Sequence, residues 1–139
     1  DKNDYDDGLT NENQLEEGGA YGIKYAIGNI TAGYGKSYIA PQGTSIATGA
    51  TTVEFYENTG WSLGYAINEA LSISYTDENS EASYLTSSTA AFDIEMTSVQ
   101  ASYNIGGATV SVARTSYENM AYVDNVDADE TILALAFAF

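Results

Sequence analysis

The last ten residues, Glu130-Thr-Ile-Leu-Ala-Leu-Ala-Phe-Ala-Phe139, carry the pattern from which the architecture of this chain follows. Large apolar side chains stand at every second position from Leu133 to Phe139, with alanines between them. A period of two places the large and the small side chains on opposite faces of a β-strand. Such a strand suits a membrane, where its large face contacts lipid and its last aromatic ring lies at the membrane–water interface.

The same alternation recurs upstream in three related segments. Each has a Tyr-x-Ile motif followed by two residues of a short turn: Tyr25-Ala-Ile-Gly-Asn29, Tyr65-Ala-Ile-Asn-Glu69 and Tyr103-Asn-Ile-Gly-Gly107. The repeat predicts short turns at one end of the strands and long polar loops at the other. A soluble β-sandwich has no reason to segregate its loops in this way, and its outward faces would be polar.

Seven strands are expected, at about residues 19–28, 29–39, 52–67, 70–77, 91–105, 108–117 and 130–139. Strands of about ten residues have the length that a tilted strand needs to cross the hydrocarbon layer. Phe92, Ile94 and Met96 have the opposite parity to the rest of the fifth strand. Either a β-bulge shifts the phase there, or the upper end of this strand contacts protein rather than lipid. The predicted fold is all-β, an antiparallel up-and-down transmembrane β-barrel.

Composition excludes several classes of function. Twenty acidic and four basic residues give a net charge of −16, so the chain cannot present the basic patch that nucleic-acid binding needs. The chain has no cysteine, which excludes disulfides, zinc–thiolate sites and thiol catalysis. It also has no histidine, the usual base for a hydroxyl nucleophile, and we therefore expect no enzyme activity. No apolar run approaches the ~18 residues of a membrane helix.

Acidic residues concentrate outside the predicted strands. Residues 1–18 show no alternation and are expected to form an acidic external loop, whereas residues 19–139 form the barrel strands. An EF-hand aligned on Gly8 fails because Gln14 stands where the motif needs glutamate. Solvated loops are the simpler interpretation of the acidic clusters. A calcium site between loops stays open as an alternative, with Asp4, Asp6, Asp7, Asp124, Asp127 and Asp129 as candidate ligands.

The two faces of the predicted strands have different expected roles. The small and polar face can line a water-filled pore, and the candidates for this lining are Lys24, Ser62, Ser72, Ser74 and Arg114. Arg114 shares a strand face with Val110 and Val112, so it lies in the lumen, near the rim or at a subunit contact. Aromatic residues of the large face are expected to form girdles at the membrane interfaces. These residues are Tyr21, Tyr25, Tyr34, Tyr38, Trp61, Tyr65, Tyr75, Tyr103, Phe137 and Phe139.

Seven strands do not make a complete bacterial barrel. Single-chain bacterial barrels have an even number of strands, and the smallest have eight. The pattern places the last residue at the short-turn end and the first at the long-loop end, so we expect the C-terminal portion of a larger barrel that begins within an external loop. The alternative is an eighth strand in residues 1–18, which lack the alternation of a strand.

The terminal pattern of Leu133, Leu135, Phe137 and Phe139 resembles the C-terminal assembly signal of Gram-negative outer-membrane proteins. The run Thr59-Gly-Trp-Ser-Leu-Gly-Tyr-Ala-Ile-Asn-Glu-Ala-Leu-Ser-Ile-Ser-Tyr75 is similar to strand–turn–strand segments of general diffusion porins, those of alphaproteobacteria in particular. The resemblance implies a sixteen-stranded, trimeric, water-filled pore that the barrel-assembly machinery inserts. It also implies a constriction formed by an inward-folded loop and by a ladder of basic residues that face acidic ones. The four basic residues of this chain depart from that ladder.

The expected function is passive diffusion of small hydrophilic solutes and ions across the bacterial outer membrane. The expected partners are outer-membrane lipid and further copies of the chain in a homotrimer, and the C-terminus is expected on the periplasmic side. The charge of −16 predicts a preference for cations. The alternative function is a structural or adhesive barrel, or a phage receptor, that acts through its long external loops.

Overall fold

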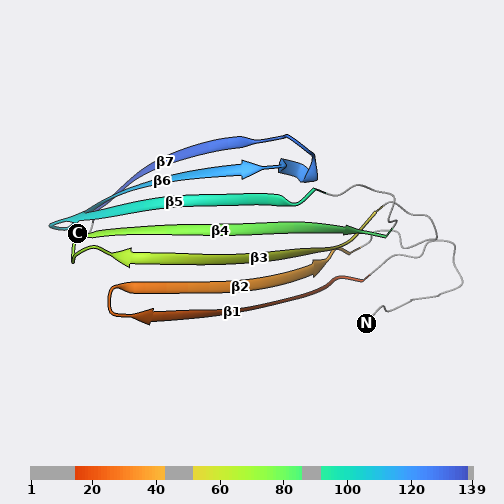
Figure 1. Cartoon of the computed structure of the whole chain (residues 1–139), viewed down its shortest axis with the longest axis horizontal. Helices are drawn as coiled ribbons and strands as arrows, with labels where there is room; N and C mark the ends of the chain where they lie inside the picture. Colours follow the sequence, from red (N-terminus) through yellow and green to blue (C-terminus); the bar gives the residue numbers. More distant parts are fainter. Residues whose placement is uncertain (1–14, 43–51, 86–91, 138–139) are drawn as a thin grey trace, which may run out of the picture.

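The structure is a computed structural model that describes residues 15–42, 52–85 and 92–137. These residues form one antiparallel sheet of seven strands in which each strand pairs with its neighbours in the sequence (Figure 1). The strands are β1 (Glu17–Ile27), β2 (Ile30–Ala40), β3 (Val53–Ala66), β4 (Leu71–Tyr84), β5 (Ile94–Ile105), β6 (Ala108–Glu118) and β7 (Ala128–Phe137), and a short 3-10 helix, η1 (Met120–Tyr122), precedes β7. Among the described residues, no helix is long and apolar enough to span a membrane.

The connections between strands are segregated as the repeat predicted. The short turns lie at one end of the sheet, and the longer connections lie at the other, which we call the long-loop end (Figure 1). Gly28, Gly106 and Gly107 have positive φ, which tight hairpin turns require and which glycine adopts without a Cβ clash. Between β3 and β4, the Asn68 side chain accepts two backbone N–H groups and closes the turn.

Within residues 15–42, 52–85 and 92–137, the seven predicted strands and their order are confirmed, and the largest difference from expectation is the length of β4. The alternation predicted that this strand ends near Asp77, but it continues to Tyr84. Its polar extension pairs in register with β3, where Asn58 lies opposite Ser80. Ladder hydrogen bonds join backbone groups whatever the side chains are, so hydropathy alone could not reveal this extension.

The pairing of β5 decides between the two explanations for its irregular parity. β5 pairs with β4 and with β6 in continuous register, so no bulge shifts its phase. Ile94 and Met96 therefore lie on the face opposite to Val99 and Tyr103. η1 lies beside β5, and the Asn119 side chain bonds to the backbone of Asp93 just before this strand. The long-loop end of β5 therefore contacts a protein segment, as the second of the two explanations expects.

The pairing divides the side chains into two faces, which we call the apolar face and the polar face. One directly paired row on the apolar face consists of Ile27, Ile30, Tyr65, Ile73, Ala101, Val112 and Leu133. A row on the polar face consists of Lys24, Gly33, Ser62, Thr76, Ser98, Thr115 and Glu130. The first row is aliphatic or aromatic in every strand, and the second is small, hydroxylated or charged in every strand.

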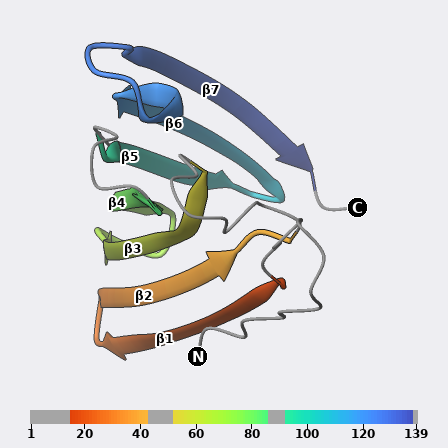
Figure 2. The ribbon, with the colours of Figure 1, turned by 90° about the vertical axis from the view of Figure 1, so that its right-hand side faces the viewer.

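The sheet is open and curved, and its edge strands β1 and β7 do not pair with each other (Figure 2). Crowding of the side chains identifies the polar face as the concave one. A Cβ added to Gly33 would lie 2.7 Å from the Ser62 Oγ, and one added to Gly60 would lie 3.0 Å from the Glu78 Cγ.

The described residues contain almost no apolar core. Ala40 and Ala82 are the buried apolar residues among them, and no large side chain is fully buried. Trp61, Leu63 and Tyr65 are 45–47% exposed, whereas the small residues between them are less exposed. A soluble antiparallel sheet buries its large apolar face and leaves polar residues in water. The exposure pattern here is the reverse.

A valine in place of Gly22 is expected to destabilise the sheet, whereas a valine in place of Gly19 is not. A Cβ on Gly22 would lie 3.2 Å from the backbone oxygen of Tyr34, which cannot rotate away, and a Cβ on Gly19 meets nothing within 4 Å. Overpacking of this kind costs ~1–3 kcal/mol, while valine itself favours strands. Denaturant unfolding in detergent micelles measures both variants. Equal stability of Gly22→Val and Gly19→Val would contradict the crowding.

Candidate functional site

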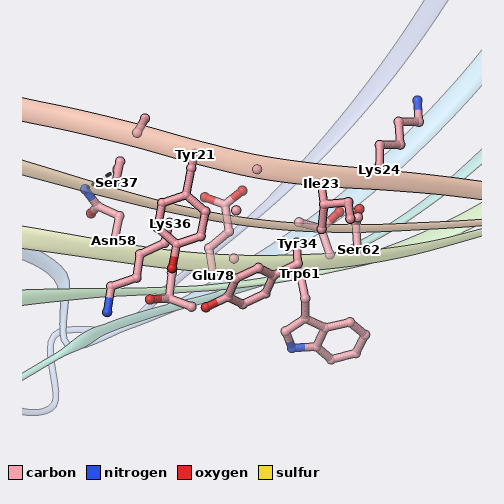
Figure 3. Close-up of a pocket in the computed structure, with 17 residues that line it drawn as sticks. Tyr21, Ile23, Lys24, Tyr34, Lys36, Ser37, Asn58, Trp61, Ser62 and Glu78 are labelled. Atoms are coloured by element: carbon pink, nitrogen blue, oxygen red, sulfur yellow. Dashed lines mark hydrogen bonds between the residues drawn. The ribbon is translucent and has the colours of Figure 1, made fainter.

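The candidate site is the polar face of the sheet. Because successive side chains of a strand alternate between faces, Lys24 of β1 shares this face with Gly33 of β2 and Ser62 of β3. Figure 3 shows the Lys24 side chain on the opposite side of the ribbons from Tyr34 and Trp61. The same parity continues through β4 to β7.

A hollow of about 540 Å³ lies over β1 to β4. Its lining includes Lys24 and Glu78 of the polar face, which carry opposite charges, and Lys36 of the apolar face. The glycines Gly22, Gly35 and Gly60 precede Glu78 in one paired row and form a floor without side chains. Within the described residues neither Lys24 nor Glu78 has an ion-pair partner, so both charges are available to a solute.

Hydroxyl groups dominate the polar face of β4 to β6. The Oγ atoms of Ser102 and Ser111 lie 3.1 Å apart across β5 and β6. The Thr115 hydroxyl donates a hydrogen bond of 3.1 Å to the Oγ of Ser98, which is only 5% exposed. A second hollow of about 260 Å³ lies over these strands. This part of the face offers uncharged polar groups to water or to a neutral solute.

Most acidic residues of the strands lie on the other face, toward the long-loop end. The register places on the apolar face Glu57, Asp77, Glu81, Glu95, Glu118 and Asp129. On the polar face the register places Glu78 and Glu130, with Lys24 as the basic residue. The charge on the polar face is therefore much smaller than the net charge of the whole chain suggests. Sequence reasoning missed Glu78 because the fourth strand was ended at Asp77; continuing its alternation would have found it.

Four of the five predicted lining residues share the polar face, and the fifth does not. Ser62, Ser72 and Ser74 lie on the same face as Lys24. Arg114 lies on the apolar face opposite Val99, where its Nη2 is 3.6 Å from the Asp129 Oδ2. Its side chain is 69% exposed, so this ion pair is strongly screened in water.

The predicted aromatic residues that the structure describes share the apolar face. They are Tyr21, Tyr25, Tyr34, Tyr38, Trp61, Tyr65, Tyr75, Tyr103 and Phe137. The ring centroids of Trp61 and Tyr75 lie 5.1 Å apart, an edge-tilted contact between β3 and β4. Leu133 and Leu135 lie on the same face, while Phe139 lies outside the described residues.

The part of the chain that the structure describes contains no group of three or more acidic side chains that could hold a metal ion. Asp127 accepts a hydrogen bond from the Asn119 backbone N–H at 3.2 Å, and Asp129 accepts one from the Ser116 hydroxyl at 2.6 Å. These two carboxylates, with Asp124, are thus not gathered into a calcium site. The candidates Asp4, Asp6 and Asp7 lie outside the described residues.

Comparisons with protein-family models, with curated proteins and with solved structures found no match to this chain.

Replacing Thr115 with valine is expected to lower stability, because the buried Ser98 hydroxyl loses its 3.1 Å donor. The cost of such a loss is about 1 kcal/mol. Thr109→Val is the matched control, since Thr109 lies on the same face of the same strand. Chemical denaturation of the folded protein in micelles compares the two variants, and an equal loss in both would show that the Ser98 contact contributes nothing.

Proposed function

We propose that this chain forms part of the wall of a water-filled transmembrane β-barrel in the bacterial outer membrane, through which small hydrophilic solutes diffuse passively. The observation that carries the proposal is the inverted sheet, whose convex face exposes large apolar side chains and whose concave face is polar. In a membrane the convex face contacts lipid and the concave face contacts water.

The apolar band crosses the paired rows at an angle, as it must when strands tilt in a barrel. The row that contains Ile23 and Trp61 in β1 and β3 reaches the polar Asp129 in β7. Phe137 instead pairs with Ala108, next to the β5–β6 turn. The band and the short turns shift in the same direction along successive strands. Barrel strands tilt by about 35–45° with a staggered register, which brings such a band to one level around the wall.

The properties of the two edge strands favour a larger barrel wall than these seven strands alone. Every residue of β1 and β7 for which the structure gives exposure is exposed, and neither strand contains the proline that protects many free edges. Unpaired backbone groups do not occur in hydrocarbon, so both edges would need partners. An up-and-down sheet of seven strands gives its edges the same direction. Antiparallel closure therefore requires an odd number of further strands, and about nine would complete a sixteen-stranded wall.

The proposal includes a homotrimer in outer-membrane lipid, with the short turns and the C-terminus on the periplasmic side. It also includes recognition by the barrel-assembly machinery of Leu133, Leu135, Phe137 and Phe139. Passive diffusion needs no catalytic group, because the wall sorts solutes by width and by electric field. A preference for cations would come from acidic residues at the long-loop end rather than from the polar face, which carries charges of both signs.

A second candidate is an adhesive or receptor barrel that acts through its external loops. The observation that favours it is the length of β3 and β4, which have 14 residues each and extend beyond the apolar band, β4 with mostly polar residues. Such an extension would hold loops above the membrane surface. A barrel of this kind could also contain a pore. A conductance measurement therefore distinguishes a barrel with an open pore from one that acts through its loops alone.

Cysteine labelling tests the two faces directly, because the chain has no cysteine of its own. In the complete barrel inserted into vesicles, Ser74→Cys and Ser102→Cys are expected to react rapidly with a charged, membrane-impermeant thiol reagent. Ile73→Cys and Val99→Cys, on the apolar face of the same strands, are expected to react about tenfold more slowly or not at all, because lipid excludes the reagent. All four should react alike after unfolding in urea. Rapid labelling of both faces in vesicles would refute a lipid-facing wall.

Planar-bilayer recordings test the pore. The complete barrel is expected to give stepwise current increments that scale with the conductivity of the salt solution, as a water-filled passage does. A protein that inserts and labels as above, but carries no current, would support the adhesive or receptor barrel instead.

A further inference from the structure

The β6–β7 loop, residues 119–127, reaches across β5 on the polar side of the sheet. Its Tyr122, in η1, packs on Tyr56 of β3 with ring centroids 5.5 Å apart. The Tyr122 hydroxyl lies 2.8 Å from the Ser80 Oγ of β4, a hydrogen bond. Ser80 pairs with Asn58, which has the same parity as Tyr56 and Ser62, so both anchors belong to the polar face. The loop therefore lies over the concave side, not beside it.

Hydrogen bonds link this loop to itself and to the neighbouring strands. The Asn119 side chain donates to the backbone oxygen of Asp93 at 3.2 Å and accepts from the Asn125 N–H at 3.2 Å. Asn119 also donates its backbone N–H to Asp127. The Asp93 carboxylate in turn accepts a hydrogen bond from Asn79 of β4. The loop is thus tied to the start of β5 and, through Asp93, to β4.

The backbone of the loop is strained. Asn119, Ala121, Tyr122 and Asn125 all have φ between 53° and 59°. Asparagine tolerates this left-handed conformation, but alanine and tyrosine rarely adopt it, at a cost on the order of 1 kcal/mol or more each. The contacts of Tyr122 with the wall are available to offset that cost. Strain of this kind persists where the surroundings over-determine a segment, often at functional sites.

Several polar-face positions at the long-loop end, near the loop, carry apolar or aromatic side chains. Tyr56, Ala82, Ile94 and Met96 occupy polar-face positions at the long-loop end, and Ala82 is only 1% exposed. Apolar side chains are not expected on a surface that only contacts water, but they are expected where a protein segment packs against it. The irregular parity of β5 thus places apolar side chains on the same face, and at the same end, as the Tyr122 contacts.

We propose that the β6–β7 loop is a fixed constriction at the long-loop mouth of the pore, seated by Tyr122 on Tyr56 and Ser80. The inference rests on the proposed function, since a loop over the polar face narrows a lumen only where that face lines one. Tyr122, the loop side chain that contacts Tyr56 and Ser80, is uncharged and limits passage by size, so neutral hydrophilic solutes such as sugars are the class that reports it. Asp124 and Asp127 of the same loop add charge, which acts on ions rather than on sugars. Tyr122 is the residue that sets this limit.

Liposome swelling with sugars of increasing size tests the constriction in the complete barrel. Tyr122→Ala is expected to raise the swelling rate for a trisaccharide, relative to a monosaccharide, by about threefold or more, because a wider mouth discriminates less. Tyr122→Phe keeps the ring contact and is expected to stay close to the unmodified protein. Tyr103→Ala, which removes an aromatic ring from the apolar face near a short turn, is expected to leave the ratio unchanged.

Tyr56→Ala removes the wall side of the same ring contact and is expected to act in the same direction, so the test holds if Tyr122→Ala fails to insert. An unchanged trisaccharide ratio in the inserted variants, with normal swelling by the monosaccharide, would overturn the constriction and leave the pore intact. No swelling with any sugar in the unmodified protein would instead overturn the pore itself.

Discussion

The backbone hydrogen-bond ladder that runs from β1 to β7 is the interaction on which this structure depends, because the described residues have almost no apolar core. Burial of large side chains stabilises most soluble sheets, but here those side chains point outward. In hydrocarbon each unpaired N–H or C=O costs several kcal/mol, so a complete ladder becomes the dominant constraint. In the proposed membrane wall, the same constraint would require partners at the free edges of β1 and β7.

Curvature and the division into two faces have a common origin in side-chain size. Glycines such as Gly22 and Gly60 occupy the concave side, where an added Cβ would meet the neighbouring strand at 3.2 Å or less. Large residues such as Trp61 occupy the convex side, where space increases with distance from the backbone. Small residues inside and large residues outside therefore favour one direction of bending, and this direction places the polar face on the inside of the curve.

Charge and size are controlled by different parts of the proposed pore. The strand carboxylates lie mostly on the convex face toward the long-loop end, and the concave face carries Lys24, Glu78 and Glu130 together with many hydroxyl groups. The β6–β7 loop adds a physical obstruction, held by Tyr122 rather than by an ion pair. A wall of this kind would discriminate among neutral solutes mainly by their size.

Local patterns in the chain were enough to predict seven strands, their order, the segregation of turns and the identity of the apolar face, because alternation and turn chemistry involve neighbouring residues. They were not enough for the upper half of β4, whose polar residues pair through backbone groups that hydropathy does not see. Arg114 could not be assigned to a face until its pairing with Val99 was known. The seat of Tyr122 joins three segments far apart in the sequence, and only the folded sheet brings Tyr56 and Ser80 beneath it.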